Sequence, residues 1–354
     1  MRIVHVCRVG WPRVGGMESA VHGLACWQQR QGNTVRVITL DRLRSGEPRF
    51  RDGQCDGVAY ERIRSVGPAR YPVPIGLKRA VGEADLVHVH GLDGIADVAV
   101  RTLDAPVGVS THGGFFHTRR QWRLKQIWLR TLTRSTLSRA RAVWFTSERD
   151  RERLLPAGVS GSVLGNGVNV DRFVAKRQPE AGRWVMLGRV EPHKGLADLA
   201  RWLPVLPVTL HVVGEVLDAD HVARVVDRLA DAGCAHKLVI HGELGRSGVA
   251  EQLSRAQLLV APSHAEGFGI AVVEAMGAGL PVCVSAGTAL EERVADGGGW
   301  ALEFRAAETG PILQELAAGE HTKVGERARQ VSMRYGWDEV GTQWNEAYRR
   351  LMEG

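Results

Sequence analysis

The stretch 257–281 places an apolar run, a glycine loop and a helix pattern in direct succession, and it limits the possible folds more than any other part of the sequence. Residues 257–261 are mostly apolar and end at Pro262, which predicts a buried parallel strand. Residues 270–278 are apolar and good helix formers, and Gly279 predicts the end of that helix. A strand that leads through a loop into a helix is typical of α/β proteins with a parallel sheet.

The loop of this unit carries groups that suit a phosphorylated or hydroxylated ligand. Gly267 and Gly269 permit backbone conformations and a close ligand approach that a side chain would block. The helix that starts at Ile270 directs its free N–H groups at this loop, where a phosphate or sugar oxygen is the natural ligand. Glu266 in the loop and Glu274 inside the helix add carboxylates, which accept hydrogen bonds from vicinal hydroxyls.

The second half of the chain repeats the alternation of strand and helix. Further strands are expected at 184–187, 208–213, 237–241 and 282–285, and this alternation predicts a parallel sheet. Arg189 and Lys194 follow the first of these strands around a proline turn. Two cations on one loop at a strand end suit a diphosphate, with the arginine as a fork and the lysine as a point charge.

The first half begins with a strand at 2–7, a helix from about Glu18 to Arg30 and a strand at 35–40, which together form a βαβ unit. The glycines between the first strand and the helix, at 10, 15 and 16, do not fit the G-x-G-x-x-G spacing, so the fingerprint of a nicotinamide site is weak.

Another strand at 105–110 leads to His112. Because ligands in open α/β sheets bind beyond the carboxyl ends of strands, His112 is placed at the binding crevice.

Three motifs together resemble the signature of retaining GT-B glycosyltransferases of the large family four. They are EGFG at 266–269, EAM at 274–276 and GLPV at 279–282. The resemblance implies an α/β GT-B fold of two Rossmann-like parallel-sheet domains facing each other across a cleft, with a C-terminal helix crossing back. The expected domains are an acceptor-binding domain at 1–170 together with helix 337–354, and a nucleotide-sugar-binding domain at 171–336.

The same resemblance implies roles for individual residues. The first glutamate contacts the donor sugar, the second holds the ribose, and the loop with Arg189 and Lys194 neutralises the diphosphate. The glycine pair 15–16 resembles the loop that approaches the donor phosphates, and the loop 241–245 resembles the one whose main chain meets the base. The implied donor-binding set is Gly15, Gly16, Arg189, Lys194, Leu244, Glu266, Gly267, Phe268, Gly269, Ile270 and Glu274, and the implied catalytic set is His112, Glu266, Arg189 and Lys194.

STHGGFFHT at 110–118, with segments 37–42 and 69–72, resembles a narrower group, the α-mannosyltransferases that extend lipid-linked disaccharides for xanthan-like and acetan-like exopolysaccharides. This implies transfer of mannose from GDP-mannose to a lipid-linked saccharide in exopolysaccharide or lipopolysaccharide synthesis. UDP-glucose or UDP-N-acetylglucosamine as donor, and a nucleotide-sugar epimerase of the same fold, stay open as alternatives. A basic nucleic-acid-binding protein is the alternative outside enzymes, although no recognised nucleic-acid-binding module accompanies the charge.

A strongly basic segment lies between Ala105 and Ser147, which contains no Asp or Glu. At 100° per residue, Arg119, Arg123, Arg130 and Arg134 form one stripe, and Leu124, Trp128 and Leu132 lie on another face. A basic amphipathic helix with tryptophans is typical of surfaces that meet anionic lipid, and the net charge of +7 also favours an anionic partner. The residues expected to meet the membrane and the acceptor are Arg119, Arg123, Trp128, Arg130 and Arg134.

The remaining features predict a cytoplasmic enzyme without a metal or other cofactor. The five cysteines are scattered without a C-x-x-C pair, which argues against a disulfide framework and a structural zinc site. No apolar stretch is long enough to span a bilayer, and Met1 leads directly into a strand, so we expect peripheral attachment to the inner face of the membrane. The D-x-D pattern at 218–220 lies among helix-start residues, and we interpret it as a chance match to metal-dependent transferases.

Overall fold

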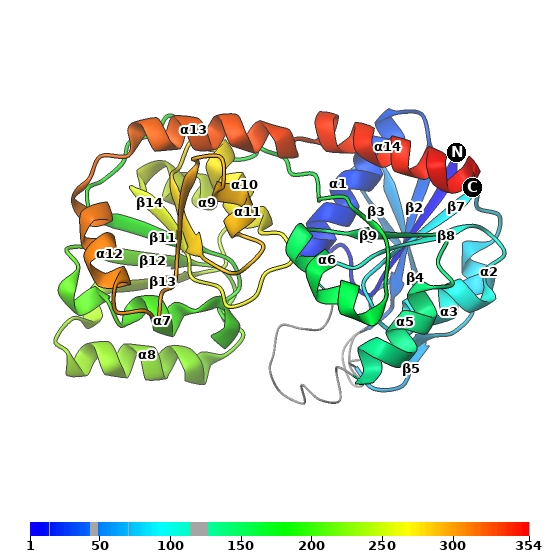
Figure 1. Ribbon diagram of the computed structural model, residues 1–354, viewed down its shortest axis with the longest axis horizontal. Helices are drawn as coiled ribbons and strands as arrows, with labels where there is room; N and C mark the ends of the chain where they lie inside the picture. The colour runs from blue at the N-terminus through cyan, green and yellow to red at the C-terminus, as the bar shows by residue number, and fades with distance from the viewer. Residues whose placement is uncertain (14, 43–48, 70, 114–126, 354) are drawn as a thin grey trace. The chain divides into compact units, whose positions relative to one another are not determined.

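In the computed structural model, the chain forms two compact units, each built around its own sheet (Figure 1). Unit 1 contains residues 1–167 and 337–354, and unit 2 contains Val168–Gly336. The structure describes residues 1–13, 15–42, 49–69, 71–113 and 127–353. The C-terminal helix α14 (Trp337–Glu353) belongs to unit 1, together with the N-terminal strand. The change of unit at Gly167 lies three residues before the predicted boundary after residue 170.

The sheet of unit 1 has eight strands in the order β10-β9-β8-β7-β1-β2-β4-β3. Its strands are β1 (Arg2–Cys7), β2 (Thr34–Leu40), β3 (Gly53–Cys55), β4 (Val58–Ile63), β7 (Leu86–His90), β8 (Val107–Ser110), β9 (Ala142–Phe145) and β10 (Ser162–Val163). Neighbours pair in parallel except β3 and β4, which form an antiparallel hairpin at one edge. This hairpin, and the small pair β5 (Ser65–Val66) and β6 (Val73–Pro74), were not predicted.

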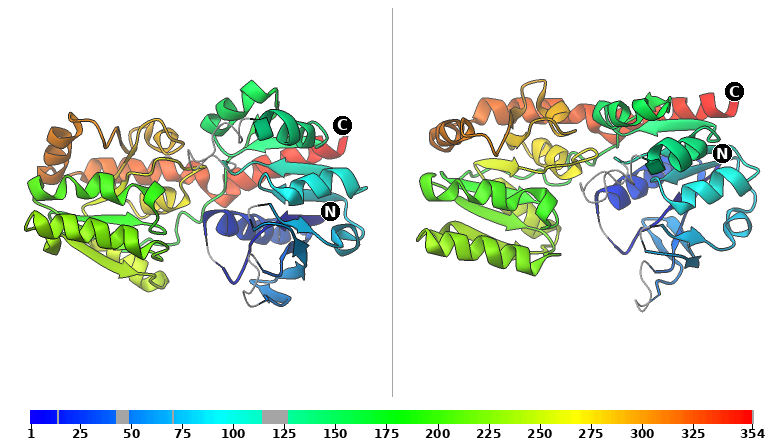
Figure 2. Two further views of the ribbon diagram at one scale, coloured as in Figure 1. Left: turned by 90° about the horizontal axis from the view of Figure 1, so that it is seen from below. Right: turned by 60° about the horizontal axis from the view of Figure 1, so that its bottom comes forward.

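Helices cover both faces of this sheet because side chains alternate along each buried strand. Odd-numbered residues of β1, such as Ile3, pack with α1 (Gly16–Arg30) and α14. Even-numbered residues, such as Val4, pack on the opposite face. The helices there are α2 (Leu77–Val81), α3 (Gly94–Thr102), η1 (Leu129–Thr133), α5 (Arg134–Leu137) and α6 (Glu148–Leu154), followed by η2 (Leu155–Ala157). Figure 2 shows these two layers from two further directions.

The sheet of unit 2 is entirely parallel, with the strand order β13-β12-β11-β14-β15-β16. Its strands are β11 (Arg183–Leu187), β12 (Thr209–Val213), β13 (Leu238–Gly242), β14 (Leu258–Ala261), β15 (Val282–Ser285) and β16 (Gly299–Leu302). The first five agree with the predicted strands to within two residues at each end. The sixth was not predicted.

Two apolar layers enclose this sheet as well. One contains α7 (Leu196–Ala200), α8 (Ala219–Asp231) and α12 (Thr309–Ala318), and the other contains α9 (Arg246–Arg255), α10 (Ile270–Gly277), α11 (Glu291–Val294) and α13 (Thr322–Ser332). Short 3₁₀ turns complete the unit: η3 (Pro192–Lys194), η4 (Leu203–Val205), η5 (Ala235–Lys237) and η6 (Met333–Tyr335). In the described part of the chain, no helix is both long and apolar enough to cross a membrane.

Candidate active site

The strand order of unit 2 defines where a ligand can bind. From β11 the chain proceeds to β12 and β13 on one side, whereas β14, β15 and β16 lie on the other side. In an open parallel sheet, this reversal leaves a crevice at the carboxyl ends of the two central strands. The loop 188–195 follows β11, and the loop 262–269 follows β14. These are the loops with the predicted cations and the first predicted glutamate, so the fold brings the two motifs to one place.

The two loops are fixed against each other by their backbones. The His264 N–H donates to the His193 carbonyl at 2.8 Å. Gly195 has a left-handed backbone with φ 77°, and a Cβ there would lie 2.0 Å from the Pro262 carbonyl oxygen. Because no side chain fits this contact, glycine at 195 allows the loops to touch.

Lys194 and Glu266 meet at this crevice. The Lys194 ammonium donates to Glu266 Oε1, which also accepts from Ser263 Oγ at 3.3 Å. Both charged side chains stay about one-fifth exposed, at 19% and 21%. Arg189 is more open, with 51% of its side chain exposed and its Nε 3.9 Å from Glu191 Oε1. The crevice therefore presents cations and a carboxylate side by side. This combination suits a ligand that has both negative charge and hydroxyl groups.

Helix α10 begins directly beside these groups. Gly269, its first flanking residue, has φ 91°, and a Cβ there would lie 2.2 Å from the Leu290 side chain. The helix N-terminus thus adds backbone N–H groups to the crevice. Phe268, a member of the predicted donor-binding set, has its ring buried against the Arg293 guanidinium and the Tyr335 ring. Its main chain alone is available to a ligand.

Glu274 is buried one turn into α10 and has a partner that the sequence analysis did not identify. Arg172 Nη1 donates to Glu274 Oε1 at 3.1 Å. Burial raises the pKa of the Glu274 carboxyl, and the Arg172 charge opposes this shift. Arg246 Nε donates to the Arg172 carbonyl at 3.1 Å, close to the loop that holds Leu244. Leu244 packs its side chain on the core, so its main chain is the part that a ligand can meet.

His112 lies in unit 1, in the loop that follows β8, and its backbone is unusual. Its φ is 47°, which is uncommon for a residue other than glycine and is concentrated at functional sites. The buried Asp150 carboxylate holds the loop on both sides of it, accepting hydrogen bonds from Thr111 Oγ1 and from the Gly113 N–H at 3.2 Å. Asp150, at the start of α6, was not predicted to shape this loop.

A chain of hydrogen-bonded side chains runs from His112 into the interior of unit 1. His112 Nε2 lies 2.9 Å from His90 Nδ1, His90 Nε2 lies 2.9 Å from His5 Nδ1, and His5 Nε2 lies 2.7 Å from Gln28 Oε1. An imidazole that is neutral has one donor and one acceptor. With the Gln28 oxygen accepting from His5, every contact along the chain is fixed in direction, and His112 keeps Nδ1 as a hydrogen-bond acceptor.

Burial keeps these imidazoles neutral. It lowers the pKa of His5 and of His112 to about 4 and that of His90 well below its ordinary value. His88 lies beside them on β7. Its Nδ1 is hydrogen-bonded to the Tyr348 hydroxyl at 2.6 Å and its Nε2 to Ser110 Oγ at 2.7 Å. The alternation HVH at 88–90 puts both histidines on the face of β1 and β7 that carries His5, and this was the signal that could have revealed the cluster.

The predicted glycine pair 15–16 lies at the start of α1. Gly15 is the flanking residue before the helix and has extended backbone. A Cβ at Gly15 would lie 2.4 Å from Glu18 Oε2, so a carboxylate of the first turn occupies the space beside it. A phosphate approaching these backbone N–H groups has to compete with that carboxylate.

The basic segment is described only from residue 127 onward, so Arg119 and Arg123 lie outside the described residues, as do Leu124 and the end of the STHGGFFHT motif. Arg130 and Arg134 are exposed, and Trp128 is 40% exposed, with its ring edge-on to Tyr71 at 5.0 Å. The prediction of a regular helix with Leu132 on its apolar face is wrong. Leu129–Thr133 forms a wider π-helical turn, which changes the spacing, and the buried side chains are Leu129, Thr133, Thr136 and Leu137.

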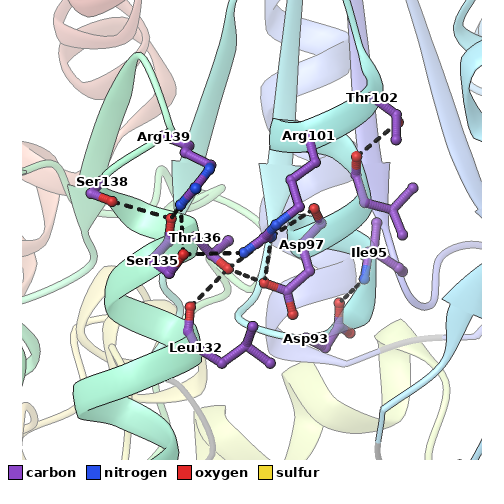
Figure 3. Close-up of polar contacts among 11 residues, drawn as sticks. Asp93, Ile95, Asp97, Arg101, Thr102, Leu132, Ser135, Thr136, Ser138 and Arg139 are labelled. Carbon is purple, nitrogen blue, oxygen red and sulfur yellow. Dashed lines mark hydrogen bonds and ion pairs between the residues drawn. The ribbon is translucent and has the colours of Figure 1, made fainter.

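Polar contacts anchor the end of this segment to α3 (Figure 3). The Thr136 hydroxyl donates to Asp97 Oδ1, and Arg101 Nη1 donates to Asp97 Oδ1 at 3.0 Å and to Thr136 Oγ1 at 3.2 Å. Arg139 Nη1 donates to the Ser135 carbonyl at 2.7 Å. Arg130, Arg134 and Arg139 are all exposed, but Arg139 is held by its contacts with Ser135.

The aspartates of the D-x-D pattern have a local structural role. Asp218 precedes α8 and its Oδ1 accepts from the His221 N–H at 2.8 Å, which is the geometry of a helix N-cap. Asp220 lies in the first turn of the same helix, where a negative charge is favourable. The start of α8 therefore explains the presence of both aspartates.

Two parallel-sheet units of this kind, one with a cationic loop beside a glycine-headed helix, define a glycosyltransferase of the GT-B class. A sucrose-phosphate synthase structure from Thermosynechococcus elongatus has the same fold, with a TM-score of 0.82, 18% identity and full coverage of both chains. The model described as Glycosyltransferase Family 4 matches residues 14–172, and the model described as Glycosyl transferases group 1 matches residues 169–310. The chain belongs to family four of the GT-B glycosyltransferases.

Two curated relatives refine this placement. A GDP-mannose:cellobiosyl-diphosphopolyprenol alpha-mannosyltransferase from Xanthomonas campestris is 36% identical over 299 residues, covering 79% of this chain and 77% of that protein. A protein of the same name from Komagataeibacter xylinus is 30% identical over 374 residues, covering 99% of this chain and 94% of the relative. The predicted family and the predicted enzyme class are thereby confirmed.

Proposed function

We propose that this glycosyltransferase moves a mannosyl group from GDP-mannose, with retention of configuration, to a lipid-linked oligosaccharide in the synthesis of a bacterial exopolysaccharide or lipopolysaccharide. The observation that carries the proposal is the meeting of Lys194 and Glu266 at the carboxyl ends of β11 and β14, beside the start of α10. This arrangement supports a sugar nucleotide as ligand. The base, the sugar and the lipid-linked acceptor are supported by the names of the two relatives.

Departure of the nucleoside diphosphate is the electrostatically demanding event, because negative charge grows on its outer phosphate. Lys194, Arg189 and the N–H groups of α10 are preorganised to stabilise that charge. These cations supply positive charge without a metal, and we propose that the reaction uses no metal or other cofactor. On this proposal, Lys194 exchanges its ion pair with Glu266 for the diphosphate when the donor binds. Glu266 is then released to accept hydrogen bonds from hydroxyls of the sugar.

The ribose is assigned to Glu274, whose carboxylate is already oriented by Arg172. An ionised carboxylate accepts from both ribose hydroxyls, which fixes the nucleoside relative to the diphosphate. Unit 1 is assigned the saccharide acceptor. There, His112 Nδ1 is proposed to accept a hydrogen bond from a saccharide hydroxyl, since the chain through His90 to Gln28 holds its other nitrogen as the donor.

A donor assay tests the proposal. Purified protein is incubated with a polyprenyl-diphosphate disaccharide and with radiolabelled GDP-mannose, UDP-glucose or UDP-N-acetylglucosamine in parallel. We expect label from GDP-mannose alone to enter the lipid fraction. Label from a UDP-sugar would replace the donor assignment, and epimerised sugar nucleotide without transfer would favour an epimerase instead.

Attachment to an anionic membrane surface is the second part of the proposal, and it follows from the charge of the basic segment. A polyprenyl-linked acceptor cannot leave the bilayer readily, so the enzyme has to meet it there. Arg130 and Arg134 are exposed beside the exposed Trp128, as a surface that contacts lipid headgroups requires. We place the enzyme at the cytoplasmic face of the membrane on this ground.

Replacing Arg119, Arg123, Arg130 and Arg134 with glutamine should abolish sedimentation with phosphatidylglycerol-containing liposomes. Each cation near an anionic surface contributes about 1 kcal/mol, so four losses weaken binding about 10³-fold. The matched control removes the same charge elsewhere, with Arg327, Arg329, Arg349 and Arg350 changed to glutamine, and should still sediment. Equal sedimentation of the two variants would show that net charge, and not this segment, attracts the protein to lipid.

A further inference from the structure

Three side chains with metal-binding atoms converge at the edge of the unit 1 sheet, away from every group assigned above. The ligand atoms of His22, Cys55 and Asp56 lie within 4.8 Å of one another, and the Cys26 thiol approaches the same histidine. His22 and Cys26 lie one turn apart on the same face of α1. Cys55 ends β3, and Asp56 occupies the turn between β3 and β4. Asp56 and Gly57 have φ 48° and 83°, which is the backbone of a tight hairpin turn. The hairpin therefore delivers one thiol and one carboxylate to the two groups of the helix.

The His22 Nε2 atom is the centre of this group. It lies 3.0 Å from Asp56 Oδ2, 3.5 Å from Cys26 Sγ and 4.0 Å from Cys55 Sγ. In a tetrahedral zinc site, with Zn–N of about 2.0–2.1 Å and Zn–S of about 2.3 Å, a ligand nitrogen lies about 3.3 Å from an oxygen ligand and about 3.6 Å from a sulfur ligand. The observed separations are within about 0.4 Å of these values. One imidazole N–H can be shared by at most one or two of the three acceptors, whereas a cation would satisfy all of them.

The other nitrogen of His22 has the partner that a metal-bound histidine requires. His22 Nδ1 lies 2.9 Å from the hydroxyl of Tyr60, which is itself buried. Metal-ligating histidines donate their second N–H to an oxygen, and this contact fixes the ring so that the ligating nitrogen faces the ion. Tyr60 on β4 thereby orients Nε2 toward the two thiols and the carboxylate.

The second histidine-rich group of unit 1, formed by His5, His88 and His90, is a weaker candidate. Each ring nitrogen named in that cluster already has a side-chain partner, and His5 Nδ1 lies 2.9 Å from His90 Nε2. Two nitrogens on one zinc ion lie about 3.3 Å apart, so this spacing fits a hydrogen bond better.

We propose that His22, Cys55 and Asp56 hold Zn²⁺ or a metal of similar softness, and that Cys26, whose thiol lies next to His22 Nε2, turns in as the fourth ligand when the ion binds. Two thiolates favour a soft divalent ion over Mg²⁺ or Ca²⁺, and four protein ligands make a closed, structural site. The ion would clamp the β3–β4 hairpin to α1 at an edge of the sheet. This site is distinct from the donor crevice of unit 2. The spacing argument considered only cysteines close together in the sequence, whereas these two cysteines belong to different elements that the fold brings together.

The test uses the purified full-length chain, treated with a chelator and kept reduced with a phosphine. Titration with Co²⁺ should give one ion per chain and a thiolate-to-cobalt charge-transfer band, and Zn²⁺ should displace the cobalt and raise the melting temperature. Zinc should also protect Cys26 and Cys55 from alkylation, as read by peptide mass spectrometry. Absence of stoichiometric binding, or alkylation of both thiols at the same rate with and without zinc, would overturn the proposal.

Variants locate the ligands. Cys55→Ser should abolish most of the charge-transfer band, and Asp56→Asn, which tolerates the same left-handed backbone, should weaken binding at least tenfold without unfolding the hairpin. Tyr60→Phe removes the group that orients His22 and should weaken metal binding about 10- to 100-fold. The control Arg51→Ala, an exposed residue two positions before β3, should bind like the wild type. If Cys55→Ser binds cobalt as tightly as the control, these residues are not the ligands.

Discussion

Replacing Lys194 with methionine lowers the turnover number by about 10²- to 10³-fold, while the enzyme keeps its fold. Methionine preserves the length of the side chain and removes the ammonium that faces the crevice. Removing one preorganised group that stabilises developing charge typically costs that much in catalysis. Because the charge grows during departure of the diphosphate, the loss should be larger in kcat than in donor affinity.

Two further variants make this result specific. Lys194→Arg keeps the charge but replaces a point charge with a planar fork, so it should recover only part of the activity. Lys323→Met removes an exposed lysine from α13 of the same unit and should turn over like the wild type. Steady-state kinetics with GDP-mannose measure all three. A Lys194→Met variant within twofold of the wild type would remove Lys194 from the catalytic set.

Unit 1 should lose stability steeply as the pH falls below about 6.5. Burial lowers the pKa of His5 from 6.5 to about 4 and also lowers the pKa of His88 and His90. Below pH 6.5 the unfolded chain therefore binds protons that the folded chain does not, so the free energy of unfolding falls with the pH. Each such histidine contributes up to about 1.4 kcal/mol per pH unit. At pH 5 the shift of His5 alone costs about 2 kcal/mol, and the lowered pKa values of His88, His90 and His112 add to this loss in the same direction.

Scanning calorimetry between pH 7.5 and pH 5 measures this loss as a fall in the melting temperature of unit 1. His88→Gln keeps an amide donor and acceptor for Tyr348 and Ser110 but cannot titrate, so its melting temperature should depend less on pH than that of the wild type. His236→Gln, an exposed histidine of unit 2, serves as the control and should follow the wild type. A melting temperature that stays constant down to pH 5 would mean that the cluster accepts protons in the folded state.

Local patterns were sufficient to predict the strands and loops that build the donor crevice. Apolar runs such as 257–261 and 282–285 are recognisable because a parallel strand is buried on both faces. Gly269 and Lys194 could be placed because both lie in loops that follow such strands, where the topology gathers ligand-binding loops. The strand-end rule thus predicted which residues of unit 2 would meet.

Long-range partners could not be predicted in the same way. Arg172 precedes its partner Glu274 by 102 positions, and nothing in the local sequence distinguishes it from other arginines. Asp150 likewise acts on a loop almost 40 positions away. The β3–β4 hairpin left a signal, the Asp56-Gly57 pair, but its strands are too short for a periodic pattern. Without that hairpin, Cys26 and Cys55 had no reason to be considered together.

The sugar nucleotide is proposed to bind at the carboxyl edge of the unit 2 sheet, with its ribose on Glu274 and its sugar on Glu266. Calorimetric titration of GDP into the wild type and two variants tests this proposal most directly. Glu274→Gln replaces charged hydrogen bonds with weaker neutral ones, so GDP affinity should fall about tenfold. Glu266→Gln removes a carboxylate that GDP does not contact and frees Lys194 for the diphosphate, so affinity should be unchanged or higher.

The control Glu326→Gln, at an exposed position of α13, should bind GDP like the wild type. The two glutamate variants should therefore differ, and only Glu274→Gln should lose affinity for GDP. Wild-type GDP affinity in Glu274→Gln, or a larger loss in Glu266→Gln, would contradict it.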